Sequence, residues 1–174
     1  PRADVVRLCW FGTVVARCIP LLEGALASIV SELQSSSISI EVVTAPTQRA
    51  GIEAMFSRLG PLRAGLHCQF TAWSLAATWQ ALDRCDIVLL PRVFEADIAA
   101  AKSHNRMVEA IRAGRIAVAA PIPAYEELSD CTWVGEDLAA GVHWAISQPE
   151  DALARIRRGQ EVIAARFAPE VIAK

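Results

Sequence analysis

Residues 85–91 read CDIVLLP, which is the clearest strand signal in the chain. The apolar run from Ile87 to Leu90 is unbroken and stops at Pro91. A strand with apolar side chains on both faces is typical of a parallel sheet that helices cover on both sides. This stretch therefore predicts an α/β fold.

Outward from this strand, strand-like apolar runs alternate with helical patterns. Because such alternation implies parallel strands joined by right-handed crossovers, we expect a single doubly wound Rossmann-like domain over residues 1–174, with a mostly parallel six-stranded sheet in the order 3-2-1-4-5-6. The expected strands are 5–10, 38–43, 65–71, 85–91, 115–121 and 131–134, and the expected helices are 20–33, 48–60, 74–84, one that ends at Gly114, 135–146 and 149–167.

The composition excludes several classes of protein. A formal net charge of −2 gives no broad basic surface, so we expect no nucleic-acid partner. No apolar stretch is long enough for a transmembrane segment. The five cysteines are odd in number and widely spaced, which favours reduced thiols in a cytoplasmic protein. Because the histidines are scattered and no Cys/His pair has metal-ligand spacing, we expect no metal and no cofactor.

In a sheet with this strand order, ligands bind between the first and fourth strands, beyond their carboxyl ends. Gly12 follows the first strand, where it is either a ligand-contacting glycine or an ordinary turn. The G-x-G-x-x-G pattern is absent, which counts against an NAD-dependent dehydrogenase. Trp10 and Pro91 end the two strands and are candidate base or sugar contacts; Tyr125, beyond the fifth strand, either stacks a base or belongs to a structural turn.

Residues 101–115 read AKSHNRMVEAIRAGR and contain Lys102, the only lysine before the last residue of a chain with 17 Lys and Arg. Either Lys102 reflects compositional drift, or a compact point charge is needed there, as at phosphate sites. Ser103 is the expected N-cap of the next helix, so the free amides around residues 104–106 point outward with the positive end of the helix dipole. Together with Lys102 they form a candidate pyrophosphate site.

Glu109 lies one turn further along this helix, where its carboxylate could accept hydrogen bonds from ribose hydroxyls. The alternative is an ion pair with Arg106 or Arg112. For His104 we weigh a phosphate or sugar contact against simple exposure. The candidate ligand-binding residues are Gly12, Lys102, Ser103, His104, Asn105, Arg106 and Glu109, and no catalytic residue is identified.

Lys102, Asn105, Arg106, Glu109, Ala110, Ala113 and Gly114, followed by RIAVAAPIPAYEEL, resemble the C-terminal, nucleotide-sugar-binding Rossmann domain of retaining, group 1-like GT-B glycosyltransferases. The resemblance implies glycosyl transfer from a nucleotide-diphosphate sugar. This family commonly has two glutamates eight positions apart, whereas Glu95 precedes Glu109 by 14, so Glu95 is not carried over as the first of them.

We therefore expect the donor-binding half of a metal-independent glycosyltransferase; the alternative is a non-catalytic binding or regulatory module. The resemblance implies an acceptor-binding N-terminal Rossmann domain, or a second chain, that the 174 residues lack. We expect the chain alone to be inactive. We also expect an exposed apolar patch near its start or its final helices, with self-association as the consequence.

Overall fold

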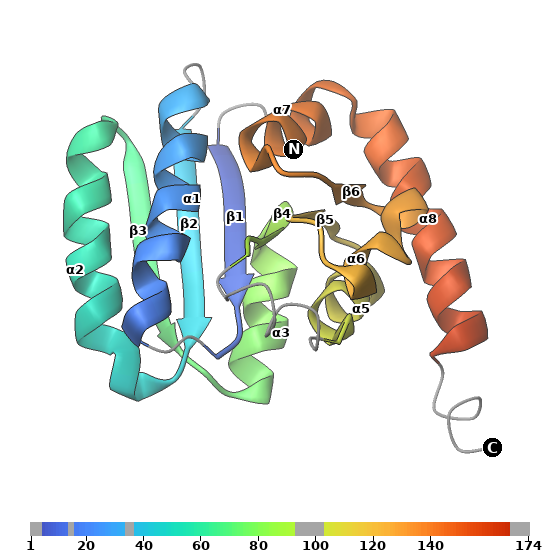
Figure 1. Ribbon diagram of the computed structural model, residues 1–174, viewed down its shortest axis with the longest axis horizontal. Helices are drawn as coiled ribbons and strands as arrows, with labels where there is room; N and C mark the ends of the chain where they lie inside the picture. Colours follow the sequence, from blue (N-terminus) through green and yellow to red (C-terminus); the bar gives the residue numbers. More distant parts are fainter. Residues whose placement is uncertain (1–4, 14–15, 34–36, 93–102, 168–174) are drawn as a thin grey trace.

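The computed structural model describes residues 5–13, 16–33, 37–92 and 103–167 of the chain. It contains one six-stranded sheet in the order β3-β2-β1-β4-β5-β6, and neighbouring strands in this sheet are parallel (Figure 1). The fold class and the strand order expected from the sequence are confirmed. The strands are β1 (Val5–Phe11), β2 (Ser37–Thr44), β3 (Leu66–Ala72), β4 (Ile87–Leu90), β5 (Ile116–Ala119) and β6 (Trp133–Val134).

The central strands are buried on both faces. All four residues of β4 and all four of β5 are buried. This burial explains the unbroken apolar run in CDIVLLP, since each side chain of a central strand faces a helix layer rather than water. The edge strand β3 instead alternates between half-buried and exposed side chains along most of its length.

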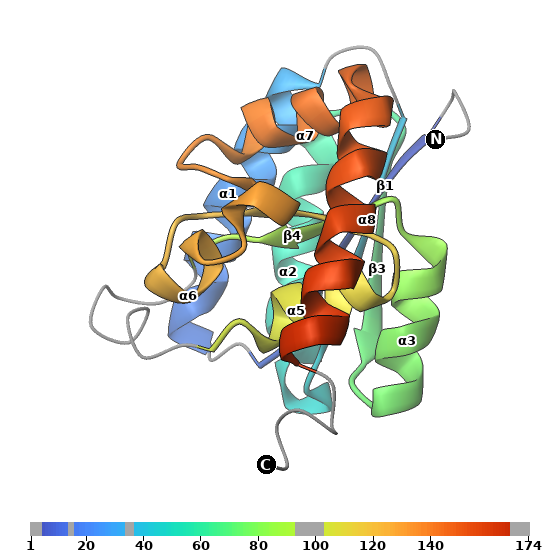
Figure 2. The ribbon, with the colours of Figure 1, turned by 90° about the vertical axis from the view of Figure 1, so that its right-hand side faces the viewer.

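Helices cover both faces of the sheet (Figure 2). On one face, α1 (Ile19–Glu32), α2 (Arg49–Leu59) and α7 (Leu138–Ser147) pack on a core that includes Leu22, Ile52 and Val142. On the other face lie α3 (Leu75–Arg84) and α5 (Asn105–Arg112), and α8 (Pro149–Arg166) contributes residues to both cores. Short helical turns complete the chain: η1 (Ala16–Cys18), η2 (Pro46–Gln48), η3 (Gly60–Leu62), α6 (Pro123–Glu126) and η4 (Ser129–Cys131).

β1, β2 and β3 end at the lower side of Figure 1, and the carboxyl edge of the sheet positions the candidate site. β1 lies between β2 and β4 in the sheet. β2 and β3 are added on one side of β1, and β4, β5 and β6 are added on the other side. The segment after β1 and the start of α5 therefore meet where the strand order reverses.

Large exposed apolar side chains are spread over the described surface. Leu153 is the only one on α7 or α8, whereas Trp73 and Leu75 lie close together in sequence before and at the start of α3. The apolar patch was expected near the start or the final helices, where Leu21 on α1 and Leu153 on α8 are exposed. A hollow of about 330 Å³ with a largely apolar lining, which includes Val6, Ile146 and Leu153, also lies between the start of β1 and the final helices. No described helix has the length and apolar content to cross a bilayer.

Candidate functional site

Gly12 and Arg106 meet at the reversal point of the sheet. The backbone N–H of Gly12 donates to the Val43 carbonyl at 3.0 Å, and its φ of 139° lies in a region that side chains other than glycine rarely adopt. A Cβ atom at Gly12 would lie 3.2 Å from Cδ and 3.3 Å from Nη1 of Arg106. The Arg106 side chain therefore crosses from α5 to the end of β1, directly over the glycine.

Arg106 carries a positive charge that no described carboxylate neutralises. Its side chain is half-buried, its guanidinium carbon lies 5.9 Å from the centre of the Trp10 ring, and it belongs to none of the ion pairs among the described residues. Trp10 itself is fully buried, so it supports Arg106 from below instead of forming an open wall of the crevice. A cation that is held in place but not neutralised can attract an anion.

Glu109 lies next to this cation without an ion pair. Burial raises the pKa of the Glu109 carboxyl group, and the charges of Arg106 and Arg112 oppose that rise. The alternative of a direct ion pair with either arginine is wrong, because neither forms one with Glu109 in the described part of the chain. The carboxylate is half-buried and free to accept hydrogen bonds.

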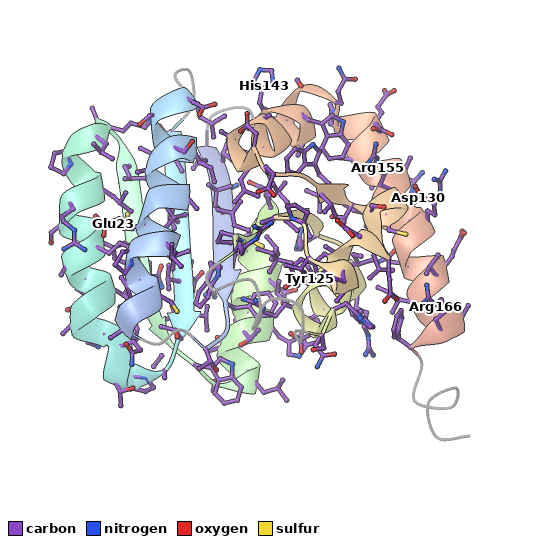
Figure 3. The ribbon with its side chains drawn as sticks, in the orientation of Figure 1. Glu23, Tyr125, Asp130, His143, Arg155 and Arg166 are labelled. Carbon is purple, nitrogen blue, oxygen red and sulfur yellow. The ribbon has the colours of Figure 1, made fainter. Side chains whose placement is uncertain are left out.

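Tyr125 lies inside the molecule beside α5, as Figure 3 shows. Its residue is only 2% exposed, so the ring offers no open surface on which a base could stack. The reason is α6, a helical turn that agrees with the structural-turn alternative: it turns Tyr125 inward together with Ile122 and Leu128, which are also buried. The spacing of these three residues by three positions was the available signal.

Three buried polar groups near the carboxyl edge have no hydrogen-bond partner among the described residues. They are Nε1 of Trp10, Oγ1 of Thr44 and the hydroxyl of Tyr125. Buried polar atoms are nearly always paired in proteins, so these three groups stand out among the described residues. Thr44, the last residue of β2, was not among the residues proposed from the sequence.

The start of α5 differs from the expectation by one residue. His104, and not Ser103, occupies the N-cap position, and no side chain caps the helix. The first amide bonded within the helix is that of Val108, which donates to the His104 carbonyl at 2.9 Å, so the free amides are those of residues 105–107. The centres of the His104 and Phe167 rings lie 4.6 Å apart in an edge-to-face contact, while Ser103 and Asn105 are exposed. Lys102 and Glu95 lie outside the described residues.

An arginine joins the segments that follow β4, β5 and β6. Nη2 of Arg92 donates to the Pro121 carbonyl at 3.0 Å and to Oε1 of Glu136 at 2.9 Å. The neighbouring Pro91 is buried at the end of β4. Arg92 thus organises the far side of the carboxyl edge, while its own charge is already matched by Glu136.

A polar hollow of about 550 Å³ lies away from this edge, over the first halves of β1 and β2. Its lining includes Glu41, which forms an ion pair with Arg84 at 2.8 Å and accepts a hydrogen bond from Thr71 at 2.7 Å. Because these charges match one another, the hollow has the character of a structural contact between α3 and the sheet, and the carboxyl edge remains the better candidate site.

The fold matches solved glycosyltransferase structures over nearly the whole chain. TarM from S. aureus, in a complex with fondaparinux, α-GlcNAc-glycerol and UDP, superimposes over 99% of this chain with a TM-score of 0.71 and 14% identity. HepE from Anabaena, in complex with UDP and glucose, covers 98% with a TM-score of 0.68 and 18% identity. The C-terminal domain of the group 1 glycosyltransferase LpcC from Francisella tularensis covers 94% with a TM-score of 0.63 and 15% identity. The chain has the fold of a group 1 GT-B C-terminal domain.

This GT-B likeness concerns one domain of larger proteins. The chain spans 35% of the TarM chain and 46% of the HepE chain, but 87% of the isolated LpcC domain. No family profile matches the sequence, and no curated protein sequence matches it. The resemblance noted in the sequence therefore holds at the level of the fold.

Proposed function

We propose that this domain binds a nucleotide-diphosphate sugar and is the donor half of a glycosyltransferase. The observation that carries the proposal is Arg106, which is held over Gly12 and Trp10 at the reversal point of the sheet without a neutralising carboxylate. The same edge of an open parallel sheet is where ligands bind in doubly wound folds. TarM and HepE, which share this fold, were solved with UDP.

The diphosphate lies, in this proposal, between Arg106 and the free amides of residues 105–107. An exposed helix start attracts anions, because its unpaired N–H groups and the positive end of the dipole point the same way. Lys102 adds a second positive charge just before the helix and, with Arg106, stabilises the leaving diphosphate without a metal ion. Ser103 and Asn105 are exposed at this end of the helix, where they line the approach to it.

The ribose lies against Glu109, about one turn deeper. A carboxylate there can accept hydrogen bonds from two neighbouring hydroxyl groups, which offsets the cost of keeping it half-buried and ionised.

Transfer itself requires a second domain, or a second chain, that presents the acceptor. The positioning of two reactants against one another supplies much of the rate enhancement in group transfer, and this domain can hold only the donor. We place the protein in the cytoplasm, a proposal that its five free cysteines support.

Calorimetric titration of the chain with UDP, GDP, ADP and uridine tests the proposal. At least one diphosphate is expected to bind, with uridine weaker than UDP. Arg106→Gln should weaken the diphosphate by about 10-fold or more, since a hydrogen bond to a charged group contributes roughly 1.5–3 kcal/mol. Arg112→Gln is the matched control, because Arg112 is exposed on the same helix and the charge change is the same.

Two results would overturn this function. One is the absence of binding to every nucleoside diphosphate at millimolar concentration, which would favour the alternative of a non-catalytic module. The other is an equal loss of affinity in the Arg106 and Arg112 variants, which would show that the general charge of the domain, and not the seat over Gly12, attracts the ligand.

A further inference from the structure

Arg106 is fixed in place by groups that leave its charge intact. Gly12 gives it room, with a Cβ position 3.2 Å from its Cδ, and the buried Trp10 ring lies 5.9 Å from its guanidinium carbon. The guanidinium carries five N–H donors in one plane, and this plane must be oriented before it can bind a phosphate through two parallel hydrogen bonds.

Tyr125 is the neutral acceptor within reach of Arg106. The residue is 2% exposed, and its hydroxyl has no hydrogen-bond partner among the described residues. Burial raises the pKa of the Tyr125 phenol, and the charge of Arg106 together with its hydrogen-bonding contact to the hydroxyl opposes that rise. The two groups are thus close neighbours, but the contact does not reach the geometry of a full hydrogen bond, which leaves the hydroxyl without a partner among the described residues. A small movement of the guanidinium would complete the bond.

We propose that Tyr125 is a positioning residue. When an anion binds at Arg106 over Gly12, the Tyr125 hydroxyl accepts a hydrogen bond from Arg106 and orients the remaining N–H groups of the guanidinium toward a phosphate. This inference rests on the proposed function. A hydroxyl suits the task because it orients the guanidinium without cancelling its charge, whereas a carboxylate in its place would neutralise Arg106 and compete with the ligand. The hydrogen bond would also pair the Tyr125 hydroxyl, whose burial without a partner otherwise costs folding free energy.

A double-mutant cycle with UDP and inorganic pyrophosphate tests the inference. Tyr125→Phe keeps the buried ring and removes only the hydroxyl, and it should weaken both ligands roughly 10-fold, the effect of one hydrogen bond. If Tyr125 acts through Arg106, the same substitution should change nothing in an Arg106→Gln background. Full additivity of the two substitutions would mean that Tyr125 acts independently, and the assignment would be wrong.

A spectroscopic measurement avoids any risk that Tyr125→Phe fails to fold. Tyr125 is the only tyrosine of the chain, so protein labelled with ¹³C-tyrosine gives one tyrosine ring signal. That signal should shift when pyrophosphate is added to the wild type and stay fixed in Arg106→Gln. An unmoved signal in wild-type protein that binds pyrophosphate would overturn the positioning role alone. Wild-type protein that binds neither pyrophosphate nor UDP would overturn the proposed function, and the positioning role with it.

Discussion

At the scale of single residues, Glu109, which we propose binds the ribose, is held in the folded state at a cost in stability. Burial raises the pKa of its carboxyl group, so the folded state binds this proton more tightly than the unfolded state does. The stability that protonation contributes is complete below the ordinary pKa of glutamate, near 4.3, and is lost as the pH rises through the raised value. At neutral pH the folded chain therefore keeps an ionised group that it would prefer to protonate.

Glu109→Gln should accordingly raise the free energy of unfolding at pH 7 while it weakens both uridine and UDP. The gain in stability should disappear below about pH 4, where glutamate is protonated in both states. Urea unfolding at several pH values and calorimetry check the two halves. Lower stability of the variant at pH 7, or unchanged uridine binding, would contradict the account.

Substitution of Lys102 should distinguish the two ligands that the Glu109 variant weakens alike. Lys102→Ala should weaken UDP by about 1.5–3 kcal/mol, because a hydrogen bond between charged groups is lost, and should leave uridine unaffected. Thermal unfolding should hardly change. An equal effect on nucleoside and nucleotide would show that Lys102 does not contact phosphate, and no effect at all would leave compositional drift as the reason for this lysine.

Sequence patterns predicted residues that follow a periodic rule and missed those that depend on tertiary contacts. Arg106 was proposed from its place at a helix start, but its path over Gly12 and Trp10 depends on how α5 sits against β1. For Tyr125 the sequence left base stacking and a structural turn open, and only the tertiary structure shows that α6 forms such a turn and directs the ring into the core. Ser103 was expected at the N-cap of α5, but His104 occupies this position and no side-chain hydroxyl caps the first turn.

At the scale of elements, the strands were the most predictable part of the fold. β4 and β5 are short and buried on both faces, so their apolar runs could hardly have another explanation. The end of α5 was also predictable, since Gly114 has a φ of 71° and its amide donates to the Ile111 carbonyl at 2.9 Å, as glycines past helix ends commonly do. No comparable pattern in the sequence predicted the contact between α8 and α5.

That contact makes a prediction about Gly159 on α8. A Cβ at this position would lie 2.7 Å from Cγ2 of Ile111 and 3.1 Å from Cβ of Cys131, so Gly159→Ala should destabilise the fold by about 1–3 kcal/mol. Gly24→Ala is the matched control within α1, because no heavy atom lies within 4 Å of its Cβ position. The control should stabilise by up to about 1 kcal/mol. Urea unfolding that gave both variants the same sign would refute the close packing of α5 and α8.

At the scale of the whole molecule, we propose a domain that binds a donor and needs a second domain or chain to use it. The 174-residue chain should bind a nucleotide diphosphate yet release no sugar to an added acceptor, because we expect the second domain or chain to orient the acceptor hydroxyl. A coupled assay for release of the nucleoside diphosphate from UDP-glucose, UDP-GlcNAc or GDP-mannose measures this. Efficient transfer by the chain alone would show that the acceptor site lies within it.

The most direct test of the central claim is a ¹⁵N–¹H NMR titration of the chain with UDP. The account predicts that the largest shifts fall on the amides of Gly12, Asn105, Arg106 and Glu109, at the carboxyl edge of the sheet. It also predicts that residues of the polar hollow, such as Ser39 and Gln69, stay unchanged. Shifts confined to that hollow, or no shifts at millimolar UDP, GDP and ADP, would contradict the donor site proposed at Arg106.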